Sequence, residues 1–280
     1  MELGVGSFAC YKQELVDFLP LFAQFNVRQM ELWTFSSFAN PLHFKYKDEE
    51  YLENFLALLL KFNLRACSVH APIDSEVNIS SPDPVLREEA VKETIKAIDA
   101  LAKLGGKILV IHPGGKSAVR EKQLRIASGS LQRIESYCRK LNIRLTLENM
   151  LPGYVGSKVE DFEYLLTSLS PRAGICLDTG HGFLNDNLFE LMDALGERLF
   201  HLHIQDTHRG SDEHLLPFQG KIDWEKFMIK LSQIHYEGVL MMEIREAKNN
   251  GLEGILNGAR CAFEKLIGQE KSSRDEKDER

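Results

Sequence analysis

The sequence lacks the features that mark a secreted or membrane-spanning protein. Its five cysteines are odd in number, scattered along the chain and never spaced as Cys-x-x-Cys, which argues against a disulfide framework. No apolar run approaches the ~20 residues that cross a bilayer, and the first residues show no signal-peptide pattern. We therefore expect a cytoplasmic protein with reduced cysteines and no membrane association.

Positive charge is also in short supply. Lysine and arginine total 34 against 41 aspartates and glutamates, which gives a formal net charge of −7 at pH 7. This balance provides no general attraction for nucleic acid or for an anionic membrane, so we do not expect nucleic acid as a partner. A Gly-x-Gly-x-x-Gly motif is missing after the first expected strand, which disfavours an open dinucleotide-binding sheet.

Strand-like and helix-like segments alternate along the whole chain. Short apolar runs predict strands at residues 3–8, 27–33, 64–70, 107–112, 144–148, 174–178, 200–203 and 239–243. Helical periodicity lies between them, at residues 13–25, 51–62, 83–104, 124–141, 158–169, 188–195, 224–234 and 252–267. Eight such units predict a single-domain (β/α)8 TIM barrel over residues 1–268. Residues 269–280 are charged and lack apolar side chains, so we expect a disordered tail there.

Six of the expected strands end in a residue type that binds divalent metals. These strand-end residues are His70, His112, Glu148, Asp178, His203 and Glu243. Taken singly, each is more often a structural hydrogen-bonding group, but a barrel delivers all its strand ends to one mouth. Three carboxylates buried together need a cation to neutralise them. We therefore predict a metal centre at Glu148, Asp178, His203 and Glu243, with Zn²⁺ or Mn²⁺ as the expected ion.

Two further motifs place ligand-type residues beyond the strands. His181 follows Asp178 in Asp-Thr-Gly-His, and Asp212 and His214 are separated by one residue in the loop after the seventh strand. A solvated loop is an equally good interpretation of Asp212 and His214 when they are taken alone.

The body of the chain, to about Gly268, resembles the xylose isomerase-like barrel superfamily. The resemblance is carried by VHAP at 69–72, NISSPD at 78–83, VIHPG at 110–114, LENM at 147–150, CLDTGH at 176–181 and DEHLLP at 212–217. That group includes sugar and sugar-phosphate isomerases and epimerases, and the type-2 apurinic/apyrimidinic endonucleases. The resemblance implies the same four-residue metal set. In the endonuclease branch it also implies further ions, up to three in all, at positions that match His70, His112, His181, Asp212 and His214. In the isomerase branch the imidazole that matches His181 usually contacts substrate instead, so these five residues are candidates for either additional metal binding or substrate binding.

Departures from the endonuclease pattern favour the sugar branch. Ile73 stands where that pattern has a DNA-probing aromatic residue, and the acidic Glu213 stands where it has a basic one. Since DNA binding depends on neutralising phosphates, both exchanges weaken it. We predict a metal-dependent isomerase or epimerase of a sugar, sugar phosphate or related ketone, and the alternative is a multinuclear zinc phosphodiesterase acting on abasic DNA.

The expected chemistry passes through an enediolate, with Glu148 and Glu243 as both ligands and acid/base pair. Arg245, Trp33 and Glu31 are candidates for binding the small sugar-like substrate. An ordinary salt bridge is the competing interpretation for Arg245, and core packing is the competing one for Trp33. The exposed helices of such a barrel could support a homo-oligomer.

Overall fold

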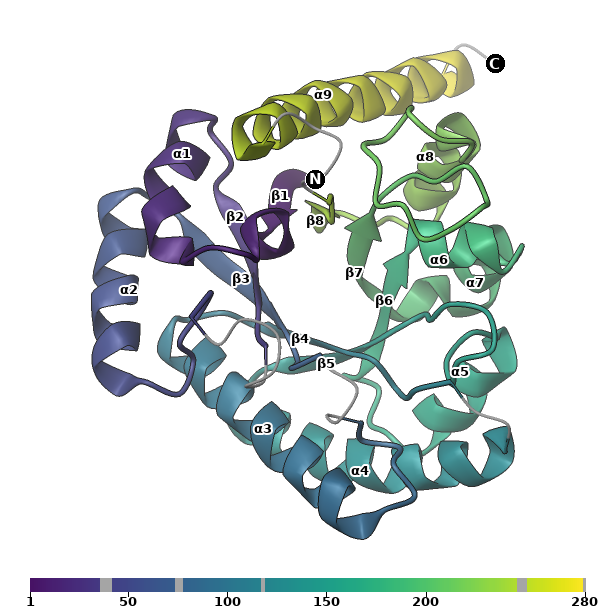
Figure 1. The fold of residues 1–280 in the computed structure, drawn as a ribbon. Helices are drawn as coiled ribbons and strands as arrows, with labels where there is room; N and C mark the ends of the chain where they lie inside the picture. The colour runs from purple at the N-terminus through teal and green to yellow at the C-terminus, as the bar shows by residue number, and fades with distance from the viewer. Residues whose placement is uncertain (36–41, 74–77, 117–118, 246–250, 279–280) are drawn as a thin grey trace.

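The computed structural model describes residues 1–35, 42–73, 78–116, 119–245 and 251–278, with backbone alone beyond residue 268 (Figure 1). Eight parallel strands form a closed barrel in chain order, and β1 pairs with β8 to close it. The strands are β1 (Glu2–Gly6), β2 (Gln29–Trp33), β3 (Arg65–His70), β4 (Ile108–Ile111), β5 (Arg144–Glu148), β6 (Gly174–Asp178), β7 (Leu199–Ile204) and β8 (Val239–Met242). The predicted TIM barrel is confirmed.

A ring of helices covers the outside of the barrel (Figure 1). They are α1 (Leu19–Gln24), α2 (Glu49–Lys61), α3 (Pro84–Lys103), α4 (Arg120–Lys140), α5 (Val159–Thr167), α6 (Thr179–Leu184), α7 (Leu188–Leu195), α8 (Trp224–Gln233) and α9 (Gly251–Asp278). Short 3₁₀ turns lie at η1 (Ser7–Cys10), η2 (Leu15–Phe18) and η3 (Gly196–Arg198). In the part of the chain that the structure describes, no helix is long and apolar enough to cross a membrane.

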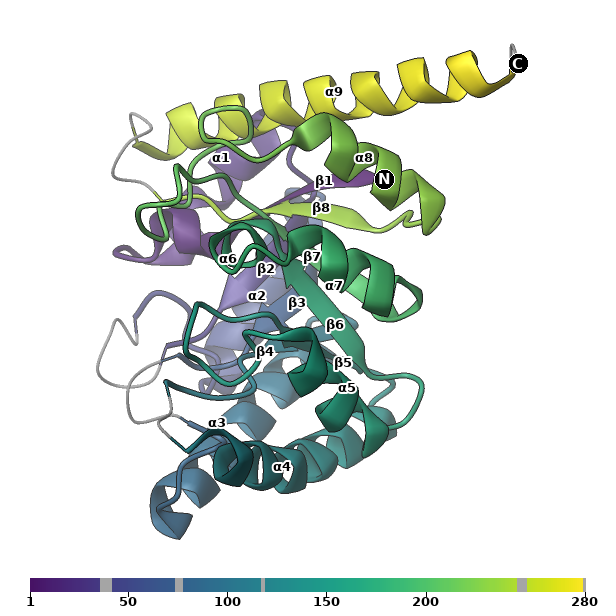
Figure 2. The same ribbon diagram turned by 90° about the vertical axis from the view of Figure 1, so that its right-hand side faces the viewer.

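Two helices differ from their predicted extents. The helix expected at residues 13–25 is divided into η2 and α1, because Pro20 has no N–H group to donate and fits only the first turn of a helix. At the other end of the chain, α9 continues to Asp278 through the segment for which we expected disorder. That segment is rich in glutamate, lysine and arginine, which are good helix formers. Figure 2 shows the end of α9 reaching beyond the barrel, and the domain boundary at residue 268 remains a prediction.

The apolar core lies between the barrel and its helices, where Phe22, Phe55, Phe162 and Phe227 are fully buried. The carboxyl ends of the strands, in contrast, bury a dense set of polar side chains. Parallel strands all present these ends to one mouth, so the packed core holds the polar groups in fixed positions. Burying so much polar surface is costly unless each group finds a partner, which makes this mouth the natural place to look for a functional site.

Candidate metal centre

The structure brings the four predicted metal ligands together at the barrel mouth. Glu148 ends β5, Asp178 ends β6, His203 lies near the end of β7, and Glu243 directly follows β8. Each offers a ligand atom within 4.8 Å of the others, and none of the four is more than 2% exposed. Asp178 and His203 are register partners on adjacent strands, so the sheet itself fixes their separation. Their convergence follows from parallel pairing, although a ligand role for them remains a prediction.

Three atoms at the centre of this group face one another. His203 Nδ1 lies 3.2 Å from Glu148 Oε1 and 3.0 Å from Glu243 Oε2. None of these three atoms makes a hydrogen bond within the described residues, although all are buried. A buried imidazole nitrogen and two buried carboxylate oxygens that face one another are the donor set that a divalent cation requires. The residues present therefore fit a metal ion.

Asp178 completes the group and is held from several sides. One of its carboxylate oxygens accepts a hydrogen bond from the backbone N–H of His181, and both oxygens lie 3.2 Å from Gln205 Nε2. Burial raises the pKa of Asp178 to about 7; His181 opposes the rise, and the negative charges of Glu243 and Glu148 add to it. The raised pKa thus reflects the repulsion among the buried carboxylates of Asp178, Glu148 and Glu243, which a bound cation would offset.

A second group forms on the other side of Glu148. His70 Nε2 lies 3.0 Å and His112 Nε2 lies 3.2 Å from Glu148 Oε2. The ligand atoms of these three residues also lie within 4.8 Å of one another, close enough to share a metal ion. His70 Nδ1 lies 2.8 Å from the Ala71 carbonyl, so that nitrogen donates its proton there. Although burial raises it, the pKa of Glu148 is held well below its ordinary value by His203 and His112. Glu148 is therefore shared between two candidate cation positions.

The remaining predicted ligands surround Asp212. His214 Nε2 lies 2.8 Å from Asp212 Oδ2, and His181 Nε2 lies 3.7 Å from Asp212 Oδ1. The other ring nitrogens of these histidines contact backbone carbonyls, at Asn149 for His181 and at Glu243 for His214. Among the described residues these three form no ligand group as tight as the two above. They border the centre without closing a third position.

Gln205 bridges these groups, although no sequence motif predicted it. Its Nε2 contacts both oxygens of Asp178 and also Asp212 Oδ1 at 2.9 Å, and its Oε1 accepts from the His214 N–H. It lies two residues after His203 on the same side of the chain, so only the strand alternation hinted at it.

The three predicted substrate-binding residues lie in different environments. Trp33 is 6% exposed, stacks on Phe8 with ring centroids 4.3 Å apart, and also lies against His70. Arg245 is exposed, and its Nη1 donates to the Asp212 carbonyl at 3.3 Å. Their substrate roles remain predictions. Glu31 is fully buried, and its two carboxylate oxygens form hydrogen bonds with His201 and His203 of β7. Its position in β2 directs the side chain into the barrel rather than to the mouth. A substrate-binding role for Glu31 likewise stays a prediction.

A cavity of about 480 Å³ adjoins the centre at His112, whose side chain is 28% exposed. Its wall is mostly apolar and includes Ile73 and Tyr154, with Asn78 and Lys116 as polar members. This volume can hold a small organic molecule next to the polar centre.

The sequence model of a family described as "Xylose isomerase-like TIM barrel" matches residues 20–265. The chain belongs to this family. Among curated relatives, L-ribulose 3-epimerase from Methylomonas sp. (strain DH-1) is 30% identical over 200 residues, which cover 66% of this chain and 66% of that protein. A protein named Probable endonuclease 4, from Mycoplasmoides gallisepticum, is 25% identical over 177 residues, or 57% of this chain and 58% of that one. The crystal structure of a D-tagatose 3-epimerase-like protein matches with a TM-score of 0.85 at 22% identity, over 98% of this chain and 99% of that one. Membership of this barrel family is thus shown, and the expected resemblance is confirmed.

Proposed function

We propose that this family member is a metal-dependent epimerase or isomerase that acts on a small sugar, sugar phosphate or related ketone. The observation that carries the proposal is the convergence of His203 Nδ1, Glu148 Oε1 and Glu243 Oε2 on one buried point beside Asp178. The relationship to an L-ribulose 3-epimerase supports the substrate class.

The proposed metal ligands are Glu148, Asp178, His203 and Glu243, and Zn²⁺ or Mn²⁺ suits this mixed carboxylate and imidazole set. A divalent cation bound there would polarise a substrate carbonyl and make the adjacent C–H more acidic. The His70, His112 and Glu148 group leaves room for further ions, so one to three ions per chain remain in the proposal.

The chain's own glutamates would move the proton. Glu148 reaches the centre from β5 and Glu243 from the end of β8, and imidazoles hold the pKa of each below its ordinary value against the effect of burial. Each carboxylate is therefore ionised at neutral pH and able to accept a proton. One would remove the proton next to the carbonyl to give an enediolate, and the other would return a proton. Return to the opposite face of the same carbon is epimerisation, and return to the neighbouring carbon is isomerisation.

Other residues would orient the substrate and limit water. His112, at the boundary between the centre and the cavity, can hydrogen-bond a substrate hydroxyl, and His181 faces the same mouth from α6. Trp33 and Phe8 form a stacked apolar wall near His70, suited to the C–H face of a sugar ring. Arg245 at the rim could pair with a phosphate or carboxylate of the substrate.

The alternative is a multinuclear zinc phosphodiesterase that acts on abasic DNA. The second ligand group at His70, His112 and Glu148 favours it, as does the relative named as an endonuclease. Against it stand the net charge of −7 and the acidic Glu213, whose carboxylate accepts from the backbone N–H of His208 at the mouth. A mouth with few unneutralised cations binds a phosphate backbone poorly.

A side-by-side assay tests the two functions. Protein stripped of metal and reloaded with Zn²⁺ or Mn²⁺ is incubated in D₂O with a panel of ketoses and ketose phosphates, and separately with an abasic-site oligonucleotide. We expect nuclear magnetic resonance to detect deuterium at a carbon next to the carbonyl of at least one ketose. The oligonucleotide should stay intact. Cleavage of the oligonucleotide without ketose exchange would establish the alternative. Metal analysis provides a second criterion, since about one ion per chain favours the epimerase and about three favour the phosphodiesterase.

A further inference from the structure

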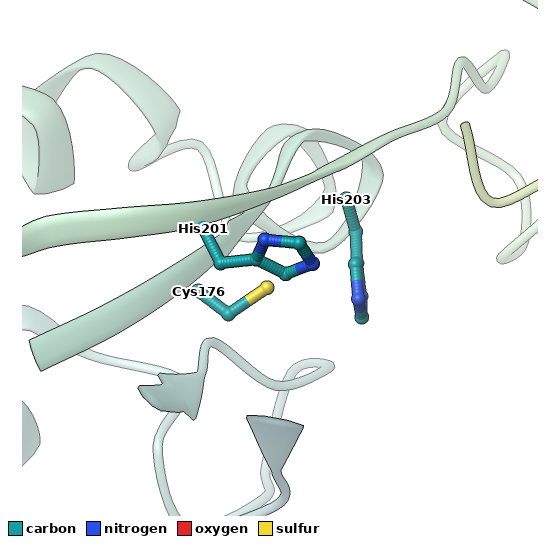
Figure 3. A group of neighbouring side chains, drawn as sticks. All are labelled: Cys176, His201 and His203. Atoms are coloured by element: carbon teal, nitrogen blue, oxygen red, sulfur yellow. The ribbon is translucent and has the colours of Figure 1, made fainter. Parts of the chain in front are cut away.

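A second polar layer lies one step deeper in the barrel than the proposed metal centre. It contains Glu31 from β2, Ser68 from β3, and His201 from β7, two residues before His203. Figure 3 shows His201 and His203 projecting into the barrel, with Cys176 beside the ring of His201. All these side chains are buried, and His201 Nδ1 makes no hydrogen bond within the described residues.

We propose that Glu31 is a positioning residue that fixes the tautomer of His203, so that its Nδ1 lone pair is presented to the metal. Glu31 Oε1 lies 2.8 Å from His203 Nε2, and Glu31 Oε2 lies 3.0 Å from His201 Nε2. The inference rests on the metal centre proposed above and assigns to Glu31 a role other than substrate binding.

The hydrogen-bond chemistry decides which nitrogen of His203 carries the proton. The two oxygens of the Glu31 carboxylate each face one imidazole nitrogen, the Nε2 of His203 at 2.8 Å and the Nε2 of His201 at 3.0 Å. An ionised carboxylate can only accept, so each Nε2 that faces Glu31 must donate. In a neutral imidazole the other nitrogen is then unprotonated. His203 Nδ1, the atom that faces Glu148 and Glu243, is therefore the one with the free lone pair.

Without Glu31 the opposite tautomer becomes available. His203 Nδ1 lies close enough to Glu243 and Glu148 to donate a proton to either, at 3.0 and 3.2 Å. That arrangement would satisfy the ring but would remove its lone pair from the cation. His201 contributes indirectly: it occupies the second oxygen of Glu31, while its Nε2 also contacts Ser68 Oγ at 3.3 Å. The carboxylate is thus held from two sides.

Cys176, His201 and His203 also each offer a ligand atom within 4.8 Å of the others. We assign this group to the support of His203 rather than to an ion, because both nitrogens of His203 are already engaged: Nε2 faces Glu31, and Nδ1 faces Glu148 and Glu243.

The experiment compares the wild type with Glu31→Ala and Glu31→Gln, using Glu93→Gln as a control for a buried carboxylate on the outer helix α3. Affinities for Zn²⁺ are measured by competition with a chromophoric chelator, and visible absorption spectra are recorded with Co²⁺. We expect Glu31→Ala to lose about 10–100-fold in metal affinity and to show an altered Co²⁺ spectrum. Glu31→Gln retains an oxygen that can accept from His203, so it should recover most of the loss, and Glu93→Gln should match the wild type.

A direct measurement covers the case in which Glu31→Ala fails to fold. Long-range ¹H–¹⁵N spectra of the Zn²⁺-loaded wild type should show His203 protonated at Nε2 and not at Nδ1. The reverse tautomer would overturn the inference, as would wild-type affinity and an unchanged Co²⁺ spectrum in a folded Glu31→Ala variant. A thiolate-to-cobalt charge-transfer band that Cys176→Ser removes would also overturn it, since the ion would then lie among Cys176, His201 and His203. If the wild type binds no metal, the proposed function itself fails.

Discussion

His203 Nδ1 lies 3.0 Å from Glu243 Oε2, and neither atom makes a hydrogen bond within the described residues. Two buried atoms that both carry lone pairs repel each other at this distance unless a proton or a cation lies between them. Glu148 Oε1 faces the same nitrogen at 3.2 Å, so the repulsion is shared by three strands of the barrel. A positive charge at this point, either a proton on His203 or a bound cation, is therefore needed to offset the two carboxylates.

Metal removal should therefore destabilise the whole protein. A cation that binds only the folded chain stabilises it by about 2.7 kcal/mol at a free concentration 100 times its Kd. For a chain of this size we expect chelation to lower the Tm by roughly 5–10 °C, with recovery when Zn²⁺ or Mn²⁺ is restored. Differential scanning calorimetry measures the shift. Asp178→Asn, which loses a proposed ligand, should show a much smaller metal-dependent shift; equal Tm values for stripped and loaded wild type would contradict the prediction.

Glu148→Gln and Glu243→Gln should each abolish turnover while the fold survives. Glutamine keeps the volume of the side chain, but it can neither take up a proton nor bind a cation as a carboxylate does. The loss of acid/base catalysis alone reduces kcat by about 10²–10⁴-fold, and weakened metal binding adds to that. Steady-state kinetics on the ketose identified by the exchange assay, together with circular dichroism, check both parts. Near-wild-type rates in either variant would remove that glutamate from the proposed mechanism.

Gly180→Ala should weaken the centre without unfolding the barrel. A Cβ at Gly180 would come within 2.4–2.7 Å of the amide group of Gln205, which bridges Asp178 and Asp212. The amide is the far end of a flexible side chain, so it can move away, but it then loses those contacts. We expect about a 10–100-fold loss of metal affinity.

Gly129→Ala in α4 is the matched control, because a Cβ there meets nothing within 4 Å. It should leave metal binding unchanged and stabilise the fold by about 0.5–1 kcal/mol, since alanine is the better helix former. Equal metal affinities in the two alanine variants would show that Gln205 does not support the centre.

The pH dependence of stability should carry a contribution from His43. Its Nδ1 donates to the Gln13 carbonyl and its Nε2 contacts Ser7 Oγ, both in the interior. Burial lowers the pKa of His43 to about 4, although the hydrogen bond to Gln13 opposes the shift. In the unfolded chain the pKa of His43 is near its ordinary value of 6.5, so the unfolded state binds a proton at this side chain more readily than the folded state does. The resulting stability is fully present above about pH 6.5 and is lost as the pH falls toward 4.

His43→Gln provides the comparison for this effect, because glutamine does not titrate. The difference in free energy of unfolding between wild type and variant should be constant above about pH 7. It should then fall by at most about 1.4 kcal/mol per pH unit between pH 6.5 and 4. Urea unfolding at a series of pH values measures it, and parallel curves across this range would exclude His43 as the source.

The order of elements could be predicted from the sequence because each rests on a local pattern. The α3 helix begins where expected: Asp83 accepts hydrogen bonds from the N–H groups of Val85 and Leu86, and Pro84 occupies the first turn. The predicted helix at residues 13–25 overlooked the effect of Pro20. The extent of α9 was also missed, because a charged composition predicts either a solvated tail or an exposed helix, and nothing in the local sequence distinguishes them.

The sequence by itself determined that Glu148, Asp178, His203 and Glu243 would meet, since parallel strands in a closed barrel place every strand end at the same mouth. Only the tertiary structure decided what surrounds them. Glu31 and His203 are 172 residues apart in the chain, and no periodicity relates their positions. Their hydrogen bond depends on the register of strands on different sides of the barrel and on the rotation of each side chain. These are set by packing across the interior, whereas a sequence pattern records only the face on which each residue lies.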